Sequence, residues 1–264
     1  MSASPINLCN QPPWVIASHH FNQNPQQLEI QGVRQANRLL FERLANLQTR
    51  ELRGLQFHDY MDVHFQLHQW QQEDSSSSRK SLKNSYLRFL RGWMFESNSR
   101  EGAVLKGWVE SRFGLAPTFH HQPIEDIHSE AYYHYLKERM QGKARTNAIE
   151  AQFDLLYEYA QYELGLKQPI TSCLTLYRGI NDFNEQRILK QLGKNHHLVR
   201  LNNLVSFTTD FERAWEFGSR VLQAEVPLAK IVFRADLLPN ALLKGEEEVL
   251  VIGGEYQVKV LTGG

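Results

Sequence analysis

The feature that most constrains the fold of this chain is a change of pattern near Gln168-Pro169. Before that point, apolar residues recur at the 3.6-residue spacing of amphipathic helices. After it, short runs rich in β-branched and aromatic residues alternate with Pro, Gly and Asn. Segregated helical and strand signals are typical of α+β proteins. We therefore predict a single unit with a mostly helical N-terminal part (1–168) and a compact, mainly antiparallel β core (169–264).

The helical repeat is clearest in three segments of the first part. A stripe of Val33, Ala36, Leu40 and Leu44 predicts one helix over 33–44. The same spacing predicts helices over 130–140 and 148–164, the second ending at Gly165. The stretch 73–78 is the most loop-like of this half and also offers an N-cap for a helix that starts near Ser81.

Five runs in the second part have strand character. They are 173–179, 204–209, 230–233, 249–252 and 256–260. Gly253-Gly254 separates the last two and predicts a turn between them. One helix is expected among the strands, because Thr209 and Glu212 match a capping box ahead of residues 213–217.

Composition excludes several classes of function. The chain has 264 residues and a formal net charge of zero, which gives no indication of the concentrated basic face that nucleic-acid binding needs. It contains no run of apolar residues long enough to span a membrane, and its start does not resemble a signal peptide. Two distant cysteines, Cys9 and Cys173, give neither a disulfide framework nor a metal-ligand spacing. We expect a cytoplasmic protein.

Eleven histidines raise the question of a metal site. His64 and His68 are four residues apart, but a third ligand and the glutamate of an HExxH motif are missing nearby. The adjacent pairs at 19–20, 120–121 and 196–197 cannot both point inward on one regular element. We therefore predict no metal. Phosphate-binding glycine loops and a nucleophile elbow are also absent from the sequence.

Polar residues mark three of the predicted strands. Arg178 and Gly179 end the first, where an arginine can present its planar fork to a phosphate or carboxylate. Ser206 and Thr208 share one face of the second. The third follows the acidic run Glu246-Glu247-Glu248, whose outer carboxylates share a face if the backbone is extended. Taken singly, these features equally suit a surface arginine, cross-strand hydroxyls and a solvated loop.

Taken together, the order Arg, Ser-x-Thr, Glu-x-Glu resembles the R-S-E class of mono-ADP-ribosyltransferases. Phe207-Thr208 stands where that class usually has Thr-Ser, and Thr208 keeps a hydroxyl on the same face. The opening residues 4–10, with Pro12-Pro13-Trp14, narrow the resemblance to the NAD⁺–dinitrogen-reductase ADP-ribosyltransferases of nitrogen-fixing bacteria. This likeness extends over essentially the whole chain.

The resemblance implies an enzyme that takes NAD⁺ as co-substrate. Glu248 would grip the nicotinamide ribose while positive charge develops at its anomeric carbon, and Ser206 would hold Glu248. Arg178 would bind a phosphate or the ribose, and Gly179 would offer its backbone to the carboxamide. Thr208 would complete this face of the NAD⁺ site. By the same resemblance, Phe217 would pack on nicotinamide and Arg220 would meet a phosphate.

The implied acceptor is an arginine of the nitrogenase iron protein, and its modification would reversibly inactivate nitrogenase. A protonated guanidinium needs a neighbouring carboxylate to orient it and take its proton. Glu246 suits that role, and Glu247 is expected to point elsewhere and to matter least. The helical part is expected to help recognise the target, and a PII-type nitrogen-regulatory protein is a possible regulator.

Two alternatives use the same fold. An NAD glycohydrolase would use water as acceptor, and Glu246 argues against it because water needs no group that activates guanidinium. A non-catalytic NAD-binding or interaction module would not depend on Glu248.

Overall fold

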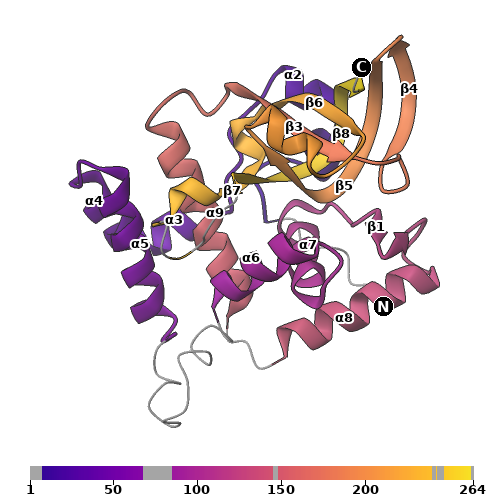
Figure 1. Cartoon of the computed structure of the whole chain (residues 1–264). Coiled ribbons are helices and arrows are strands. Elements are labelled where there is room, and N and C mark those ends of the chain that lie inside the picture. Colours follow the sequence, from indigo (N-terminus) through magenta and orange to yellow (C-terminus); the bar gives the residue numbers. More distant parts are fainter. Residues whose placement is uncertain (1–7, 68–84, 145–147, 240–241, 243–246, 263–264) are drawn as a thin grey trace.

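The computed structural model describes residues 8–67, 85–144, 148–239, 242 and 247–262 (Figure 1). Its α-helices are α1 (Pro13–Ala17), α2 (His19–Gln23), α3 (Val33–Ala36), α4 (Arg38–Ala45), α5 (Arg50–His64), α6 (Tyr86–Phe95), α7 (Arg100–Phe113), α8 (Glu130–Lys143), α9 (Ile149–Gly165) and α10 (Phe211–Trp215). Its strands are β1 (Phe119–His120), β2 (Gln122–Pro123), β3 (Cys173–Ile180), β4 (Arg187–Gly193), β5 (His196–Thr208), β6 (Arg220–Pro227), β7 (Ile231–Arg234) and β8 (Glu248–Thr262).

The later strands form one antiparallel sheet in the order β4-β5-β3-β6-β8-β7. β5 also pairs with β8, so the pairings run from β5 through β3, β6 and β8 and return to β5. Figure 1 shows this orange-to-yellow sheet in the upper part of the molecule, with α6, α7 and α8 below it. The segregation of helices and strands confirms the α+β class and the antiparallel β core.

Helix α9 joins the helical part to the sheet. Most of its residues are buried, and it packs against β7. The Tyr157 hydroxyl donates to Ala229 O at 2.8 Å, and Gln161 Nε2 donates to Ile231 O at 2.8 Å. One hydrophobic core contains side chains from α6, α7 and α9 as well as from β7 and β8. The boundary near residue 168 is therefore a change of secondary structure within a shared core.

The sequence predicted one helix over 33–44, and this was wrong. The segment forms α3 and α4, separated at Asn37, whose backbone leaves the helical region with φ −109° and ψ 26°. The Asn37 amide donates to Val33 O at 2.8 Å and accepts from the Tyr60 hydroxyl at 2.9 Å. An asparagine side chain that bonds nearby backbone competes with the helix, and here it ends α3. The predicted stripe also fails at Ala36, which is exposed.

The turn predicted at Gly253-Gly254 was also wrong. Both glycines lie within β8, which runs unbroken from Glu248 to Thr262. They face a bulge in β5, where the pairing shifts between Leu201 and Leu204. A Cβ on Gly253 would lie 1.6 Å from Asn202 O, and Gly254 has φ +110°. Gly253 allows the bulged strand to approach. A Cβ on Gly254 would instead lie 2.6 Å from Ala17 O of α1. Close backbone approach therefore explains both glycines.

The capping box predicted from Thr209 and Glu212 is replaced by a different cap. Asp210 is the N-cap of α10, and its Oδ1 accepts from the backbone N–H of Glu212 at 2.8 Å and of Arg213 at 3.2 Å. The helix ends at Trp215, so Phe217 lies beyond it. Aspartate caps a helix as well as threonine does. Because β5 continues to Thr208, the helix starts one residue later than predicted, with Asp210 as its cap.

Four of the described strands, β1, β2, β4 and β6, and the first half of β5 were not predicted. In β4 the side chains are exposed or half-buried along its length, which removes the alternation that identifies a strand. The predicted helices over 130–140 and 148–164 are confirmed as α8 and α9. The loop at 73–78, the helix start near Ser81 and His68 lie outside the described residues; α6 begins after Ser85.

Within the described residues, no helix combines the length and apolarity needed to cross a bilayer. Cys9 and Cys173 are not joined by a disulfide.

Lys230 is a buried cation in the core of the sheet. It ends the short 3₁₀ helix η3 (Leu228–Lys230) and is 0 % exposed. Its Nζ donates to Gly253 O at 3.4 Å and lies 4.8 Å from the Tyr256 ring centroid. Burial lowers the pKa of Lys230 from the ordinary 10.5 to about 7.

This lowered pKa predicts a pH-dependent stability. Between about pH 7 and pH 10 the unfolded chain binds more protons at Lys230 than the folded chain does, so the free energy of unfolding rises with pH. Lys230→Met should remove this contribution, up to about 1.4 kcal/mol per pH unit, and flatten the profile. Urea unfolding at about pH 7 and about pH 9 measures it. Lys259→Met, on an exposed position of β8, is the control; an unchanged slope in Lys230→Met contradicts the prediction.

Candidate active site

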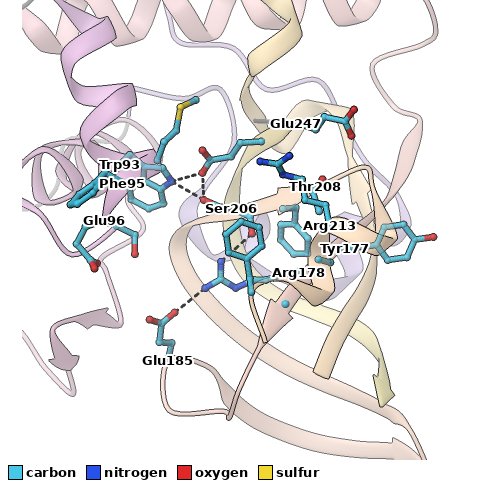
Figure 2. Close-up of a pocket in the computed structure, with 17 residues that line it drawn as sticks. Trp93, Phe95, Glu96, Tyr177, Arg178, Glu185, Ser206, Thr208, Arg213 and Glu247 are labelled. Atoms are coloured by element: carbon cyan, nitrogen blue, oxygen red, sulfur yellow. Dashed lines mark hydrogen bonds and ion pairs between the residues drawn. The ribbon is translucent and has the colours of Figure 1, made fainter. Parts of the chain in front are cut away.

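Three strands bring Arg178, Ser206 and Glu248 to one cavity of ≈ 470 Å³ (Figure 2). Arg178 lies near the end of β3, Ser206 near the end of β5, and Glu248 is the first residue of β8. Thr208 of β5 pairs with Tyr177 of β3 on one side and with Glu248 on the other. Strand pairing therefore places in one site three side chains that are far apart in the sequence.

The Glu248 carboxylate is held by two donors. Its Oε1 accepts from the Ser206 hydroxyl and from the Trp93 indole Nε1, the latter at 3.1 Å. The same indole nitrogen lies 2.8 Å from Ser206 Oγ, so the three side chains form one connected group, which Figure 2 shows as dashed lines. Glu248 is only 9 % exposed. A carboxylate fixed in this way can act on a developing charge without first reorganising.

The Arg178 guanidinium is held at its two terminal nitrogens. Nη1 donates to the backbone oxygen of Ser206 at 3.1 Å, and Nη2 pairs with Glu185 Oε2 at 2.9 Å. The Nε–H is buried and has no hydrogen-bond partner within the described part of the chain. The Ser206 residue thus contacts both Glu248, through its hydroxyl, and Arg178, through its backbone. Glu185 balances the arginine's charge from the loop between β3 and β4.

Gly179 lines the same cavity, and helix α10 explains why this residue is a glycine. A Cβ at this position would lie 2.0 Å from Ala214 O and 3.0 Å from Phe217 Cβ. Only a glycine lets the end of α10 approach β3 this closely. The approach places Phe217 at the cavity, where its side chain is 56 % exposed. Phe217 is therefore a rim residue rather than part of the core face of a helix.

Thr208 and Arg220 differ in their relation to the cavity. Thr208 lines it, and its hydroxyl accepts from the Asp210 backbone N–H at 3.1 Å, which steadies the connection from β5 to α10. Arg220 begins β6, paired with Ile180, and is not among the lining residues of the described chain. Arg213 of α10 does line the cavity and is its second arginine. The sequence had singled out Arg220 and not Arg213.

The acidic run is only partly described. Glu246 lies outside the described residues, so the structure does not place it. Glu247 is exposed at the edge of the cavity, and its carboxylate accepts from the Thr209 hydroxyl at 3.4 Å. Figure 2 shows the Glu247 carboxylate directed away from Trp93 and Ser206.

The helical part supplies one wall of the cavity, which sequence reasoning missed. Helix α6 is capped by Ser85 and buries one face, and Trp93 stands at the end of that face. Phe95 and Glu96 extend the wall to the rim, and Phe95 is 93 % exposed. A tryptophan on an amphipathic helix is read from sequence as core. Only the fold reveals that its Nε1–H meets Ser206 and Glu248.

Lys106 of α7 lies behind this wall. Its Nζ is 5.8 Å from the Trp93 ring centroid and donates to Asn98 Oδ1 and Phe119 O, both at 3.1 Å. Burial lowers the pKa of Lys106 to about 7. The bonds of Lys106 fix the segment behind the Trp93 ring and so support the position of its Nε1–H.

The cavity thus combines a fixed carboxylate, two arginines and exposed aromatic rings. A carboxylate held beside a sugar stabilises the oxocarbenium-like state formed when a glycosidic bond breaks. Guanidinium groups bind phosphates through paired N–H donors. Aromatic rings offer flat faces for a heterocycle. This set suits cleavage of a glycosidic bond in a nucleotide.

Comparison with known proteins gives a consistent result. The chain matches the family described as dinitrogenase reductase ADP-ribosyltransferase over residues 6–260. Among curated proteins, the NAD(+)–dinitrogen-reductase ADP-D-ribosyltransferase of Rhodospirillum rubrum is 45 % identical over 257 residues, covering 96 % of this chain and 93 % of that protein. No solved structure matches this chain.

Proposed function

Because the chain belongs to the dinitrogenase reductase ADP-ribosyltransferase family, we propose that it transfers ADP-ribose from NAD⁺ to an arginine of dinitrogenase reductase, the iron protein of nitrogenase. The modification would inactivate nitrogenase reversibly. The observation that carries this proposal at the level of the site is the group formed by Glu248, Ser206 and Trp93 beside Arg178.

The residues of the cavity fit NAD⁺. Its volume lies within the range of roughly 300–1,000 Å³ typical of ligand pockets. Arg178 and Arg213 are the arginines that would bind the pyrophosphate, with Gly179 and Thr208 lining the approach. Phe217 offers an exposed ring for nicotinamide. Arg220 is less well placed for phosphate than Arg213, because Arg213 lines the cavity.

The chemistry assigned to Glu248 follows from charge. As the bond between nicotinamide and ribose breaks, positive charge grows on the sugar, and a buried carboxylate stabilises that state more than the ground state. Ser206 and Trp93 hold Glu248 Oε1 in place. Arg178 keeps β3 joined to Ser206. NAD⁺ supplies the leaving group, since nicotinamide departs as a neutral molecule with the electron pair of the broken bond.

The acceptor arginine then forms a bond from a guanidinium nitrogen to the anomeric carbon and loses a proton. We assign that proton to Glu246, which precedes Glu248 by two residues. Glu247 lies between them with its carboxylate turned toward Thr209, and we expect it to contribute least.

A transfer assay tests the function. The purified chain is incubated with NAD⁺ labelled in its adenylate part and with dinitrogenase reductase. A single labelled band of dinitrogenase reductase size supports transfer. Free labelled ADP-ribose alone supports the NAD glycohydrolase, and intact NAD⁺ supports a non-catalytic module. A matched dinitrogenase reductase whose acceptor arginine is replaced by lysine should remain unlabelled.

Trp93→Phe tests the contribution of the helical wall. The change keeps an aromatic ring and removes the Nε1–H that donates to Ser206 and Glu248. A hydrogen bond to a charged group contributes about 1.5–3 kcal/mol, so kcat for NAD⁺ cleavage should fall about 10- to 100-fold. The KM for NAD⁺ should change little, because the ring surface remains. Trp14→Phe, on an exposed residue of α1, is the control; equal effects of the two changes contradict a positioning role for Trp93.

Target recognition and regulation belong to the same proposal. We infer that the helical part, residues 1–168, helps to recognise the target, and exposed Phe95 beside the cavity supports a docking surface there. A PII-type protein is the regulator that the family resemblance implies. We also infer that the reaction takes place in the cytoplasm; that Cys9 and Cys173 are not joined by a disulfide is consistent with a reducing compartment.

A further inference from the structure

A second cluster of reactive side chains lies in the helical part, outside the cavity described above. The hairpin of β1 and β2 carries His120 and His121, and α8 carries Glu138. His120 Nε2 is 2.7 Å from Glu138 Oε2, and His121 Nε2 is 3.3 Å from the same oxygen. One ligand atom from each residue lies within 4.8 Å of the other two. Two imidazoles thus share one carboxylate.

The hairpin explains how two adjacent histidines can face the same carboxylate. His121 has a left-handed backbone with φ 60°, a conformation that is uncommon outside glycine but that histidine adopts more readily than most residues. Its backbone N–H donates to Asn98 Oδ1 at 3.2 Å. The sequence argument against two metal ligands at 120 and 121 assumed that both lie on one regular helix or strand, where neighbouring side chains point in different directions. A left-handed residue between β1 and β2 removes that assumption.

We propose that His120, His121 and Glu138 bind a divalent metal ion of the zinc type. Imidazole nitrogen and carboxylate oxygen are the ligands that Zn²⁺ and Co²⁺ accept in proteins. At metal–ligand distances of about 2.0–2.1 Å, tetrahedral ligand atoms lie roughly 3.3 Å apart. The distance from His121 Nε2 to Glu138 Oε2, 3.3 Å, already equals this value. The distance from His120 Nε2 to Glu138 Oε2, 2.7 Å, has to increase by only a fraction of an ångström.

A fourth ligand position is available beside the cluster. His134 precedes Glu138 by one helical turn on α8, so both side chains lie on one face of that helix. Its ring centroid is 5.7 Å from that of His121, and it is exposed. Either His134 or a water molecule can complete a tetrahedron.

The surroundings of His120 hold its ring in place but differ from the usual outer shell of a metal site. The His120 side chain is 0 % exposed, and its Nδ1 lies 3.3 Å from Lys106 Nζ. A metal-bound histidine usually donates its second ring N–H to a carboxylate or carbonyl oxygen, whereas Lys106 places an amine at that nitrogen. The His120 ring also packs against Tyr135, with centroids 5.7 Å apart. The Lys106 charge behind the ring weakens cation binding, and the Glu138 carboxylate offsets it.

Cobalt spectroscopy and calorimetry test the proposal. The untagged full chain, stripped with a chelator and dialysed, is titrated with CoCl₂ and then with ZnSO₄. One equivalent of Co²⁺ should bind with the strong visible absorption of a tetrahedral ion and be displaced by Zn²⁺. Zn²⁺ should also raise the melting temperature, because binding to the folded chain stabilises it. Absorption no stronger than that of hydrated Co²⁺, or binding without defined stoichiometry, overturns the proposal.

Variants locate the site. His121→Asn removes the imidazole and keeps a residue that tolerates the left-handed backbone, and Glu138→Gln removes the charge at constant size. Each should weaken Zn²⁺ binding by more than the about 10- to 100-fold typical of losing an outer-shell partner. His128→Asn, on an exposed residue ahead of α8, should bind like the unchanged chain. Unaltered binding in both site variants overturns the assignment. None of these readouts requires ADP-ribosyl transfer, so they hold whether or not the proposed function does.

Discussion

Glu248→Gln should abolish both ADP-ribosyl transfer and NAD⁺ hydrolysis, each by about 10²–10³-fold, if the carboxylate contributes 3–4 kcal/mol to the transition state. The two reactions share the step that breaks the bond to nicotinamide. Glutamine has the shape of glutamate and keeps an oxygen that can accept from Ser206 and Trp93, so the local structure should persist. What is lost is the negative charge beside the developing cation. Release of labelled nicotinamide, with and without acceptor, measures both rates.

Glu247→Gln is the matched control for this change. It removes the same charge one residue earlier, from an exposed side chain that bonds Thr209 instead of Ser206. We expect activity close to that of the unchanged enzyme. Comparable losses in the two variants would mean that the negative potential of the whole acidic run matters, and not the position of Glu248. Activity of Glu248→Gln near that of the unchanged enzyme would refute the site assignment.

The fold class was readable from the sequence because its signals are local. Helical periodicity before residue 168 and β-branched runs after it are properties of short segments, and the structure confirms their segregation. The predictions of local structure were wrong where a contact with another part of the chain determines the backbone conformation. Gly253-Gly254 is a common turn sequence, yet Asn202 of the neighbouring strand makes it part of β8. The Asn37 side chain ends α3 by donating to Val33 O, and it also accepts from the distant Tyr60 hydroxyl; periodicity encodes neither contact.

The residues of the candidate site likewise fall into those that the sequence identified and those that it missed. Arg178, Ser206 and Glu248 stand at strand ends, where polar residues are conspicuous beside apolar runs, and their order matched a known pattern. Trp93 carried no such signal. Its two partners are 113 and 155 residues away, and an indole on an amphipathic helix is ordinarily part of the core. Arg213 and Glu185 were missed because charged residues in loops and short helices are common. A site whose residues come partly from the helical part can therefore be identified in full only from the fold.

The proposed metal cluster shows the same limit of sequence reasoning, because here the sequence argued against a site whose residues the fold brings together. Regular geometry correctly states that adjacent residues on a strand or helix diverge. The rule fails at His121 because a left-handed residue forms the turn of the hairpin. Backbone conformation at single residues is the property that sequence patterns predict least well, and it decides which side chains converge.

Glu246→Gln should separate the two reactions that Glu248→Gln abolishes together. Arginine is protonated at any ordinary pH, with a pKa above about 12, so a target guanidinium must lose a proton as it attacks. Water as acceptor needs no such group. If Glu246 takes that proton, its replacement by glutamine should reduce transfer to dinitrogenase reductase by about 10²–10³-fold while NAD⁺ hydrolysis continues.

The measurement compares two labels in one reaction. NAD⁺ labelled in nicotinamide reports cleavage, and NAD⁺ labelled in the adenylate part reports incorporation into protein. The ratio of incorporation to cleavage should fall in Glu246→Gln and stay constant in Glu247→Gln, which carries the same change of charge at the adjacent position. A second acceptor, a small guanidino compound, distinguishes the chemistry from docking. Loss of transfer to both acceptors indicates a defect in activating guanidinium, whereas loss confined to the protein indicates a docking defect. Parallel loss of cleavage and incorporation would assign Glu246 to NAD⁺ cleavage, and the acceptor's proton would then have to leave by another group.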